Sequence, residues 1–233
     1  AVQGSPRQEI ATHTLSHYYC LEAGQDRSSF AADLEAARAV AERFGIRLRS
    51  IVFPRNQHNP AYDDLLLAHG ITTYRGNPRS WAWRFDDTRA SRRPLKRALR
   101  LVDAYAPVTG AGTTRWEEVL RPSRLSDVRA TRPLVPYRPG LEALEGQRLT
   151  RILRGIRHAA RNREIFHLWW HPHNFGRHAE RSLSFLRSVF QGMDRCRSEH
   201  GLLSLSMAEV DRAARYRLGR ETGRPVGLSH DPA

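Results

Sequence analysis

Two histidines near the start of the chain have the type and spacing of metal ligands. His13 and His17 stand four residues apart in the stretch HTLSH. If this stretch makes one helical turn, both imidazoles face the same way and can hold a divalent metal. A zinc site also needs a third protein ligand, often a carboxylate, and a water. The pair therefore predicts part of a metal centre, and a pair of hydrogen-bonded surface histidines remains the alternative.

Arginine and histidine side chains later in the chain are candidates for catalysis. Arg55 follows an apolar run and Pro54, where a guanidinium can orient a carboxylate through paired hydrogen bonds or form a simple salt bridge. His171 and His173 follow the apolar stretch EIFHLWW. Either imidazole can act as a general acid, because imidazole titrates near neutral pH. We interpret His167, inside that stretch, as a residue of the strand face.

Two acidic pairs are weaker candidates for a carboxylate ligand. Asp63 and Asp64 open an expected helix, where negative charge stabilises the helix start. Asp86 and Asp87 follow Phe85 in a polar stretch, which favours a solvated turn. We therefore assign neither pair to the metal.

The elements that must position these residues alternate between strand and helix. The pattern predicts strands over 8–12, 49–53 and 71–74, with helices over 30–44 and 61–69 between them. This order favours parallel strands, whose carboxyl ends carry the functional loops. We expect His13, Arg55 and Arg75 to follow successive strands, and His171 to follow a further strand over 164–170, so that all lie on one rim.

The remaining pattern completes one α/β domain. Helices are predicted over 95–104, 149–160 and 183–193, and Ser206 to Glu209 form a capping box that opens a last helix. Residues 107–140 are rich in proline and glycine and are expected to form a long irregular excursion. We expect a (β/α) domain over residues 1–215 and a disordered tail over 216–233.

Composition limits the class of protein. The chain has 233 residues, of which 40% are hydrophobic and 27% charged, as in ordinary globular domains. It has no apolar run long enough for a transmembrane segment, and no signal-peptide core at its start. With only two cysteines, these features favour a cytoplasmic location. The sequence does not indicate an oligomeric state.

The positive charge has two interpretations. The formal net charge is +14, which suits a nucleic-acid partner. However, Lys96 is the only lysine, and the arginines are scattered along the chain instead of forming a block. We interpret the excess of arginine as a coding bias and expect no nucleic acid as partner, and nucleic-acid binding remains a rival hypothesis.

Four phrases in order resemble the polysaccharide deacetylase family, also called the NodB-homology or carbohydrate esterase family 4 enzymes. They are HTLSHYYC, SIVFPRNQ, YRGN and HLWWHPHNFG, which resemble a bacterial branch linked to surface-polysaccharide biosynthesis. The resemblance runs from about Glu9 to Glu209. It implies an incomplete or distorted (β/α) barrel and metal-dependent removal of N-acetyl groups from a carbohydrate.

The resemblance also implies roles for individual residues. His13 and His17 would hold the divalent metal, with zinc or another ion in that place. Arg55 would orient the catalytic base, and His171, or its rival His173, would protonate the leaving amine. The substrate side of the site would include Arg75, Trp81 and Trp83, because indole rings offer flat apolar faces to pyranose rings.

The chain departs from the family pattern at its first motif. In that family an Asp-Asp motif precedes the histidines and provides the third ligand and the base, but the 12 residues before His13 contain no aspartate. We expect a C-terminal fragment of a longer enzyme, lacking the first barrel strands and with weak or no activity. A non-catalytic carbohydrate-binding or assembly module on the same fold is the alternative.

Overall fold

The computed structural model describes residues 2–80, 94–106 and 108–219. It divides into two compact units. Unit 1 comprises residues 1–77, 116–129 and 204–233, and unit 2 comprises residues 78–115 and 130–203. Four residues singled out in the sequence lie outside the described residues: the candidate substrate-binding Trp81 and Trp83, and the acidic pair Asp86 and Asp87.

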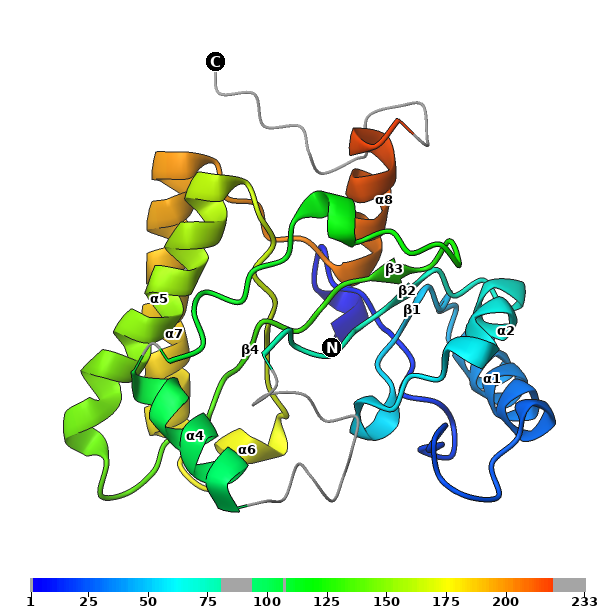
Figure 1. Cartoon of the computed structure of the whole chain (residues 1–233), viewed down its shortest axis with the longest axis horizontal. Coiled ribbons are helices and arrows are strands. Elements are labelled where there is room, and N and C mark those ends of the chain that lie inside the picture. Colours follow the sequence, from blue (N-terminus) through cyan, green and yellow to red (C-terminus); the bar gives the residue numbers. More distant parts are fainter. Residues whose placement is uncertain (1, 81–93, 107, 220–233) are drawn as a thin grey trace. The chain divides into compact units, whose positions relative to one another are not determined.

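Unit 1 is built around three short parallel strands, which lie side by side in Figure 1. Strand β1 (Ser50–Ile51) pairs with β2 (Thr73–Tyr74), and β2 pairs with β3 (Ser126–Asp127). Thr12 extends this order through a parallel bridge to Ile51. The predicted parallel order of these three segments is therefore confirmed, but residues 8–12 form no regular strand beyond the bridge at Thr12, and β1 and β2 are shorter than expected.

Helices α1 (Arg27–Glu42) and α2 (Asp63–Ala68) supply the apolar partners of this sheet. Asp26 caps α1, because its side chain accepts a hydrogen bond from Ser29 N. The chain leaves α1 through Gly45, whose φ of +67° suits a residue without a Cβ. One buried cluster joins the sheet and both helices: Tyr18, Cys20, Phe30, Leu34, Ile51, Phe53, Tyr62, Leu66, Ile71, Tyr74 and Leu125.

The other residues of the strands form a buried row of hydroxyl groups. Ser50, Thr73 and Ser126 pair in register across the sheet, and each is fully buried. Ser126 Oγ donates to Asp211 Oδ1 at 2.5 Å, and Ser50 Oγ donates to Glu9 Oε1 at 2.5 Å. Because buried hydroxyls need partners, these carboxylates stabilise the row.

Asp211 belongs to helix α8 (Met207–Arg217), which contacts β2. The predicted capping box is confirmed: Ser206 Oγ accepts from Glu209 N, and Glu209 Oε2 accepts from Ser206 N. Unit 1 also contains 3-10 helices at Val2–Gly4, Pro54–Asn56, Pro60–Tyr62 and Trp116–Glu118.

Unit 2 consists mainly of helices. Helix α5 (Glu145–Asn162) packs on α7 (Ala179–His200) and on α4 (Pro94–Tyr105). Strand β4 (Arg132–Pro133) pairs in parallel with β5 (Leu168–Trp169). The short helix α6 (His173–Gly176) follows β5, and a 3-10 helix at Glu142–Leu144 precedes α5. The helices predicted over 95–104, 149–160 and 183–193 are confirmed.

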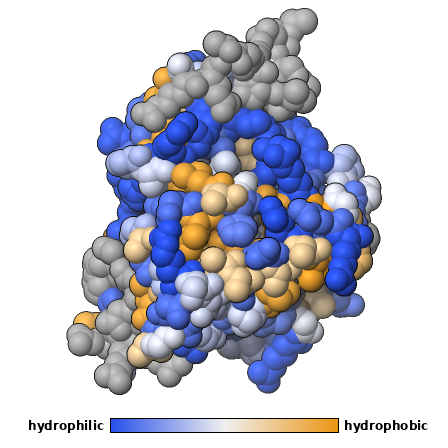
Figure 2. Space-filling view, turned by 90° about the vertical axis from the view of Figure 1, so that its right-hand side faces the viewer, coloured by the Kyte–Doolittle hydropathy of each residue, from blue (hydrophilic) through white to orange (hydrophobic). Residues whose placement is uncertain are grey.

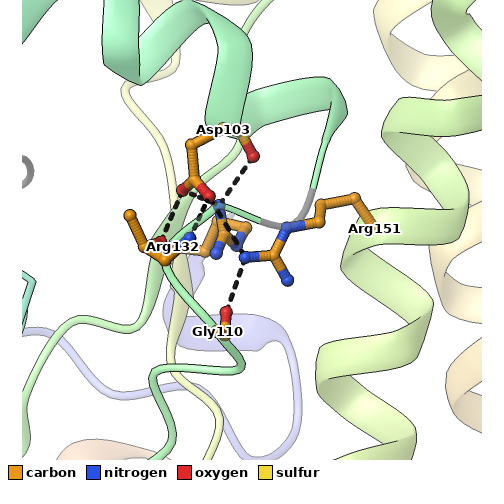
Figure 3. Close-up of polar contacts among 5 residues, drawn as sticks. Asp103, Gly110, Arg132 and Arg151 are labelled. Carbon is orange, nitrogen blue, oxygen red and sulfur yellow. Dashed lines mark hydrogen bonds and ion pairs between the residues drawn. The ribbon is translucent and has the colours of Figure 1, made fainter.

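A buried ion cluster connects α4, β4 and α5 in unit 2 (Figure 3). The carboxylate of Asp103 is fully buried and accepts hydrogen bonds from Arg132 Nη1 at 2.8 Å and from Thr109 Oγ1 at 2.7 Å. Arg151 Nη2 lies 3.3 Å from Asp103 Oδ1 and donates to Gly110 O at 2.5 Å. One carboxylate thus forms ion pairs with two buried guanidinium groups.

The expectation for residues 107–140 was wrong in part. This stretch contains β3 and β4 as well as a 3-10 helix. Both strands have only two residues, a serine and an aspartate in β3 and an arginine and a proline in β4, so no apolar alternation marks them in the sequence. The described residues form two small parallel sheets without a closed barrel, and the incomplete (β/α) barrel stays a prediction.

The surface shown in Figure 2 is mainly hydrophilic, with smaller apolar areas between the polar side chains. Exposed apolar residues include Phe44 in unit 1 and Leu95 in unit 2. Within the part of the chain that the structure describes, no helix is both long and apolar enough to cross a membrane.

Candidate functional site

The candidate site lies at the carboxyl ends of the strands of unit 1. Thr12 N donates to Ser50 O at 3.0 Å, and Val52 N donates to Thr12 O at 2.9 Å. His13 therefore leaves the sheet beside the end of β1. Arg75 N donates to Ile51 O at 3.1 Å, so the loop after β2 begins at the same edge.

His13 and His17 meet through a loop instead of the expected helical turn. Thr14 and His17 have φ values of +63° and +60°, which an α-helix does not contain. The ring centroids nevertheless lie 4.8 Å apart, with an angle of 67° between the ring planes. Both histidines are exposed, so the pair is open to a ligand.

Asp33 of α1 holds this loop in shape. Its side chain is 8% exposed, and its carboxylate accepts from Leu15 N at 2.8 Å and from Ser16 N at 2.9 Å. Ser16 Oγ donates to the same carboxylate. The left-handed conformations at Thr14 and His17 cost free energy, and these hydrogen bonds offset part of that cost.

The Nδ1 atoms of both histidines are engaged by neighbouring oxygens. His13 Nδ1 lies 2.6 Å from Val52 O, and His17 Nδ1 lies 3.0 Å from Tyr19 Oη. A carbonyl oxygen only accepts, so His13 Nδ1 is the donor and Nε2 of the neutral ring keeps its lone pair. Metal-ligating histidines typically show this arrangement, with one nitrogen hydrogen-bonded and the other bound to the metal.

The surroundings of His13 favour the neutral imidazole. Desolvation lowers the pKa of His13 below its ordinary value of 6.5, and the nearby His17 and Arg75 lower the pKa further. The hydrogen bond to the Val52 carbonyl raises the pKa and offsets part of this effect. A neutral imidazole is the form that binds a metal.

Arg55 is held beside the histidines by stacking and by an ion pair. Its guanidinium carbon lies 4.1 Å from the centroid of the Tyr19 ring, and Nη1 lies 3.4 Å from Glu22 Oε1. Gln57 Nε2 donates to the same Glu22 oxygen at 2.8 Å. The backbone φ of Arg55 is +51°, a conformation that non-glycine residues adopt at a cost and often at functional sites.

Arg75 lies deeper than Arg55 at the same edge of the sheet. Burial lowers the pKa of Arg75 to about 10, which leaves the guanidinium positively charged at neutral pH. Arg75 Nη2 donates to Asn56 Oδ1 at 2.9 Å, and Asn77 Nδ2 donates to Asn56 O at 3.2 Å. The loops after β1 and β2 are thereby joined around Asn56.

The structure brings together three of the residues singled out in the sequence. His13, His17 and Arg55 lie in one contact network of unit 1, and Arg75 joins the loop that carries Arg55. His171 and His173 belong to unit 2, where their rings stack with centroids 5.1 Å apart. That these two histidines share a rim with His13 stays a prediction.

Three residues of the network were missed in the sequence. They are Tyr19, Glu22 and Asp33. Asp33 had a signal, because it is a carboxylate within the helical stretch that carries the apolar stripe of Phe30, Leu34 and Ala37. Tyr19 and Glu22 had none, since their contacts to His17 and Arg55 arise from loop conformation.

The donor set suits two ligand positions of a metal centre. Imidazole nitrogens bind zinc and other transition metals, and the two rings are close enough for both to approach one ion. Within residues 2–80, 94–106 and 108–219, no group of three or more histidine, cysteine, aspartate or glutamate side chains is arranged to hold a metal. Among the described residues, the candidate donors at this site are therefore these two imidazoles.

Comparison of the chain with protein-family models, with curated proteins and with solved structures gives no match.

Proposed function

We propose that this protein is a metal-dependent carbohydrate deacetylase of the polysaccharide deacetylase type. The observation that carries the proposal is the paired imidazoles of His13 and His17, whose ring centroids lie 4.8 Å apart and whose Nδ1 atoms are both engaged by neighbouring oxygens. The order of the four phrases that resemble this family supports it. The substrate class is an N-acetylated sugar of a surface polysaccharide or its precursor.

In this proposal His13 and His17 hold the ion, for which zinc is the first choice. When bound, a divalent ion lowers the pKa of a water and polarises a carbonyl. The Val52 carbonyl and the Tyr19 hydroxyl engage the two Nδ1 atoms, which leaves the Nε2 atoms as the proposed ligands. Arg55, supported by Glu22 and Tyr19, presents a guanidinium that orients a carboxylate or a substrate oxygen through paired hydrogen bonds.

Arg75 adds fixed positive charge at the same edge. Its guanidinium is held by Asn56, so its position is set before a ligand arrives, and a fixed charge stabilises a developing oxyanion better than a mobile one. We assign protonation of the leaving amine to His171, with His173 as the alternative. The third ligand and the base are assigned to no described residue.

The test uses the purified chain, Zn²⁺ as the only added ligand, and N-acetylated oligosaccharides as substrates. We expect calorimetric binding of Zn²⁺ that is lost in His13→Ala and His17→Ala. The control is His158→Ala, which removes an exposed imidazole of α5. We expect acetate release by this chain to be weak or absent, and where it occurs it should require the metal and both histidines. Full zinc affinity in either alanine variant would refute the ligand assignment.

The same experiment separates the proposal from the binding-module hypothesis. Binding of metal and sugar without acetate release would indicate a carbohydrate-binding or assembly module. Affinity for nucleic acid that falls steeply with salt, in the absence of sugar binding, would favour the basic nucleic-acid-binding hypothesis.

A further inference from the structure

The side chain of Tyr19 contacts both halves of the candidate site. Its hydroxyl oxygen lies 3.0 Å from His17 Nδ1, and its ring meets the His17 ring edge-on, with centroids 5.1 Å apart. The guanidinium carbon of Arg55 lies 4.1 Å above the same ring. Tyr19 therefore joins one member of the histidine pair to the arginine.

The neighbouring residues fix the position of Tyr19. Tyr18 and Cys20 are 8% and 3% exposed and belong to the apolar core of unit 1. The Tyr18 hydroxyl also donates to Asp26 O at 2.8 Å. Because the residues on either side are anchored in the core, the backbone fixes the position of the half-buried Tyr19 side chain beside the site.

The hydroxyl group of Tyr19 has no other structural task within the described residues. His17 is its one hydrogen-bond partner there, and phenylalanine would preserve the ring and its contact with Arg55. A purely structural role would depend on the ring alone. The contact that the hydroxyl makes is therefore with His17 alone among the described residues.

We propose that Tyr19 is a positioning residue for the metal pair. Its hydroxyl oxygen accepts the proton of His17 Nδ1, so that Nε2 keeps the lone pair that a metal needs. The Val52 carbonyl does the same for His13. Outer partners of this kind commonly change metal affinity 10- to 100-fold, as an order of magnitude. The inference rests on the proposed metal site.

The experiment compares Tyr19→Phe with the wild-type chain, using Zn²⁺ alone as the ligand. We expect the variant to bind Zn²⁺ roughly 10- to 100-fold more weakly. Tyr18→Phe is the matched control, because it removes a hydroxyl one residue away that contacts Asp26 and not the histidines. Circular dichroism and thermal unfolding check that both variants fold.

The ring-nitrogen chemical shifts of His17 provide a second measurement on the metal-free chain. At pH 8 we expect the Nδ1–H tautomer in the wild type and its loss in Tyr19→Phe. The His17→Ala spectrum identifies the signals. An unchanged tautomer in Tyr19→Phe, or the Nε2–H tautomer in the wild type, would overturn the inference.

The two measurements distinguish the failure of this inference from the failure of the proposed function. If the wild-type chain binds no Zn²⁺, the metal site is refuted, and the shifts still decide whether Tyr19 positions His17. If the wild type binds Zn²⁺ and Tyr19→Phe binds it equally well, the metal site stands and the role of Tyr19 is refuted.

Discussion

The backbone of Gly76 lies directly against the carboxylate of Asp127. A Cβ at residue 76 would stand 1.8 Å from Asp127 Oδ1. Oδ2 of the same carboxylate is held by Arg121 and, at 3.2 Å, by Arg129. The carboxylate is therefore fixed, and the loop after β2 passes it only because residue 76 has no side chain.

We expect Gly76→Ala to destabilise unit 1 and to disturb the position of Arg75. Either the loop or the Asp127 carboxylate must move, and overpacking of this kind costs about 1–3 kcal/mol. The measurement is urea unfolding followed by circular dichroism. Gly146→Ala is the control, because a Cβ there meets nothing within 4 Å. Equal unfolding midpoints for Gly76→Ala and the wild type would contradict the close contact.

Much of unit 1 could be predicted from its sequence, because its signals are local. The apolar spacing from Phe30 to Ala41 gives the buried face of α1, and Gly45 marks its end. The same local rules identify the capping box of α8. In contrast, β3 was missed because polar contacts stabilise its two residues. Ser126 bonds to Asp211, which is distant in the sequence, and Asp127 pairs with Arg121. Neither contact leaves an apolar pattern.

The candidate site could be predicted in its residue types but not in its conformation. The spacing of His13 and His17 correctly placed the rings together, yet the path between them is a left-handed loop held by Asp33. That loop depends on the carboxylate of Asp33, 17 residues from Ser16. A local sequence pattern does not indicate such a contact. The role of Tyr19 was missed for the same reason.

Arg55→Gly tests the proposed role of the guanidinium separately from the stability of the fold. Glycine suits a φ of +51° better than arginine does, while the lost ion pair to Glu22 is exposed and contributes little. We expect the free energy of unfolding to change by less than about 1 kcal/mol. Acetate release, where the wild type shows it, should fall by at least about tenfold, because the bidentate contact proposed for this guanidinium is lost.

Arg124→Gly is the matched variant for this prediction. Arg124 also has a positive φ, of +71°, and an exposed side chain, but it makes no contact with the candidate site. We expect unchanged activity in Arg124→Gly. A similar loss of activity in both variants would mean that glycine at these positions acts through the backbone and not through the guanidinium.

Asp103→Asn removes the negative charge from the buried ion cluster of unit 2. Arg132 and Arg151 would then lack their counter-charge, and breaking a buried pair in this way costs about 3–5 kcal/mol. We expect a large drop in the urea midpoint of unit 2. In the control Asp64→Asn, the lost pair with Arg27 is exposed, and the midpoint should stay within the error of the measurement. Equal effects of the two variants would contradict the assigned burial of Asp103.

The two cysteines should resist alkylation in the folded chain. Burial raises the pKa of Cys20 to about 12, so at pH 8 almost no reactive thiolate is present. Cys196 is 3% exposed within α7, so a reagent cannot reach its sulfur. We expect negligible iodoacetamide labelling at pH 8 in the native chain, and labelling of both residues in denaturant. Rapid labelling of Cys20 before unfolding would show that the segment carrying Tyr18 and Tyr19 is not anchored in the core, and the positioning of His17 would lose its support.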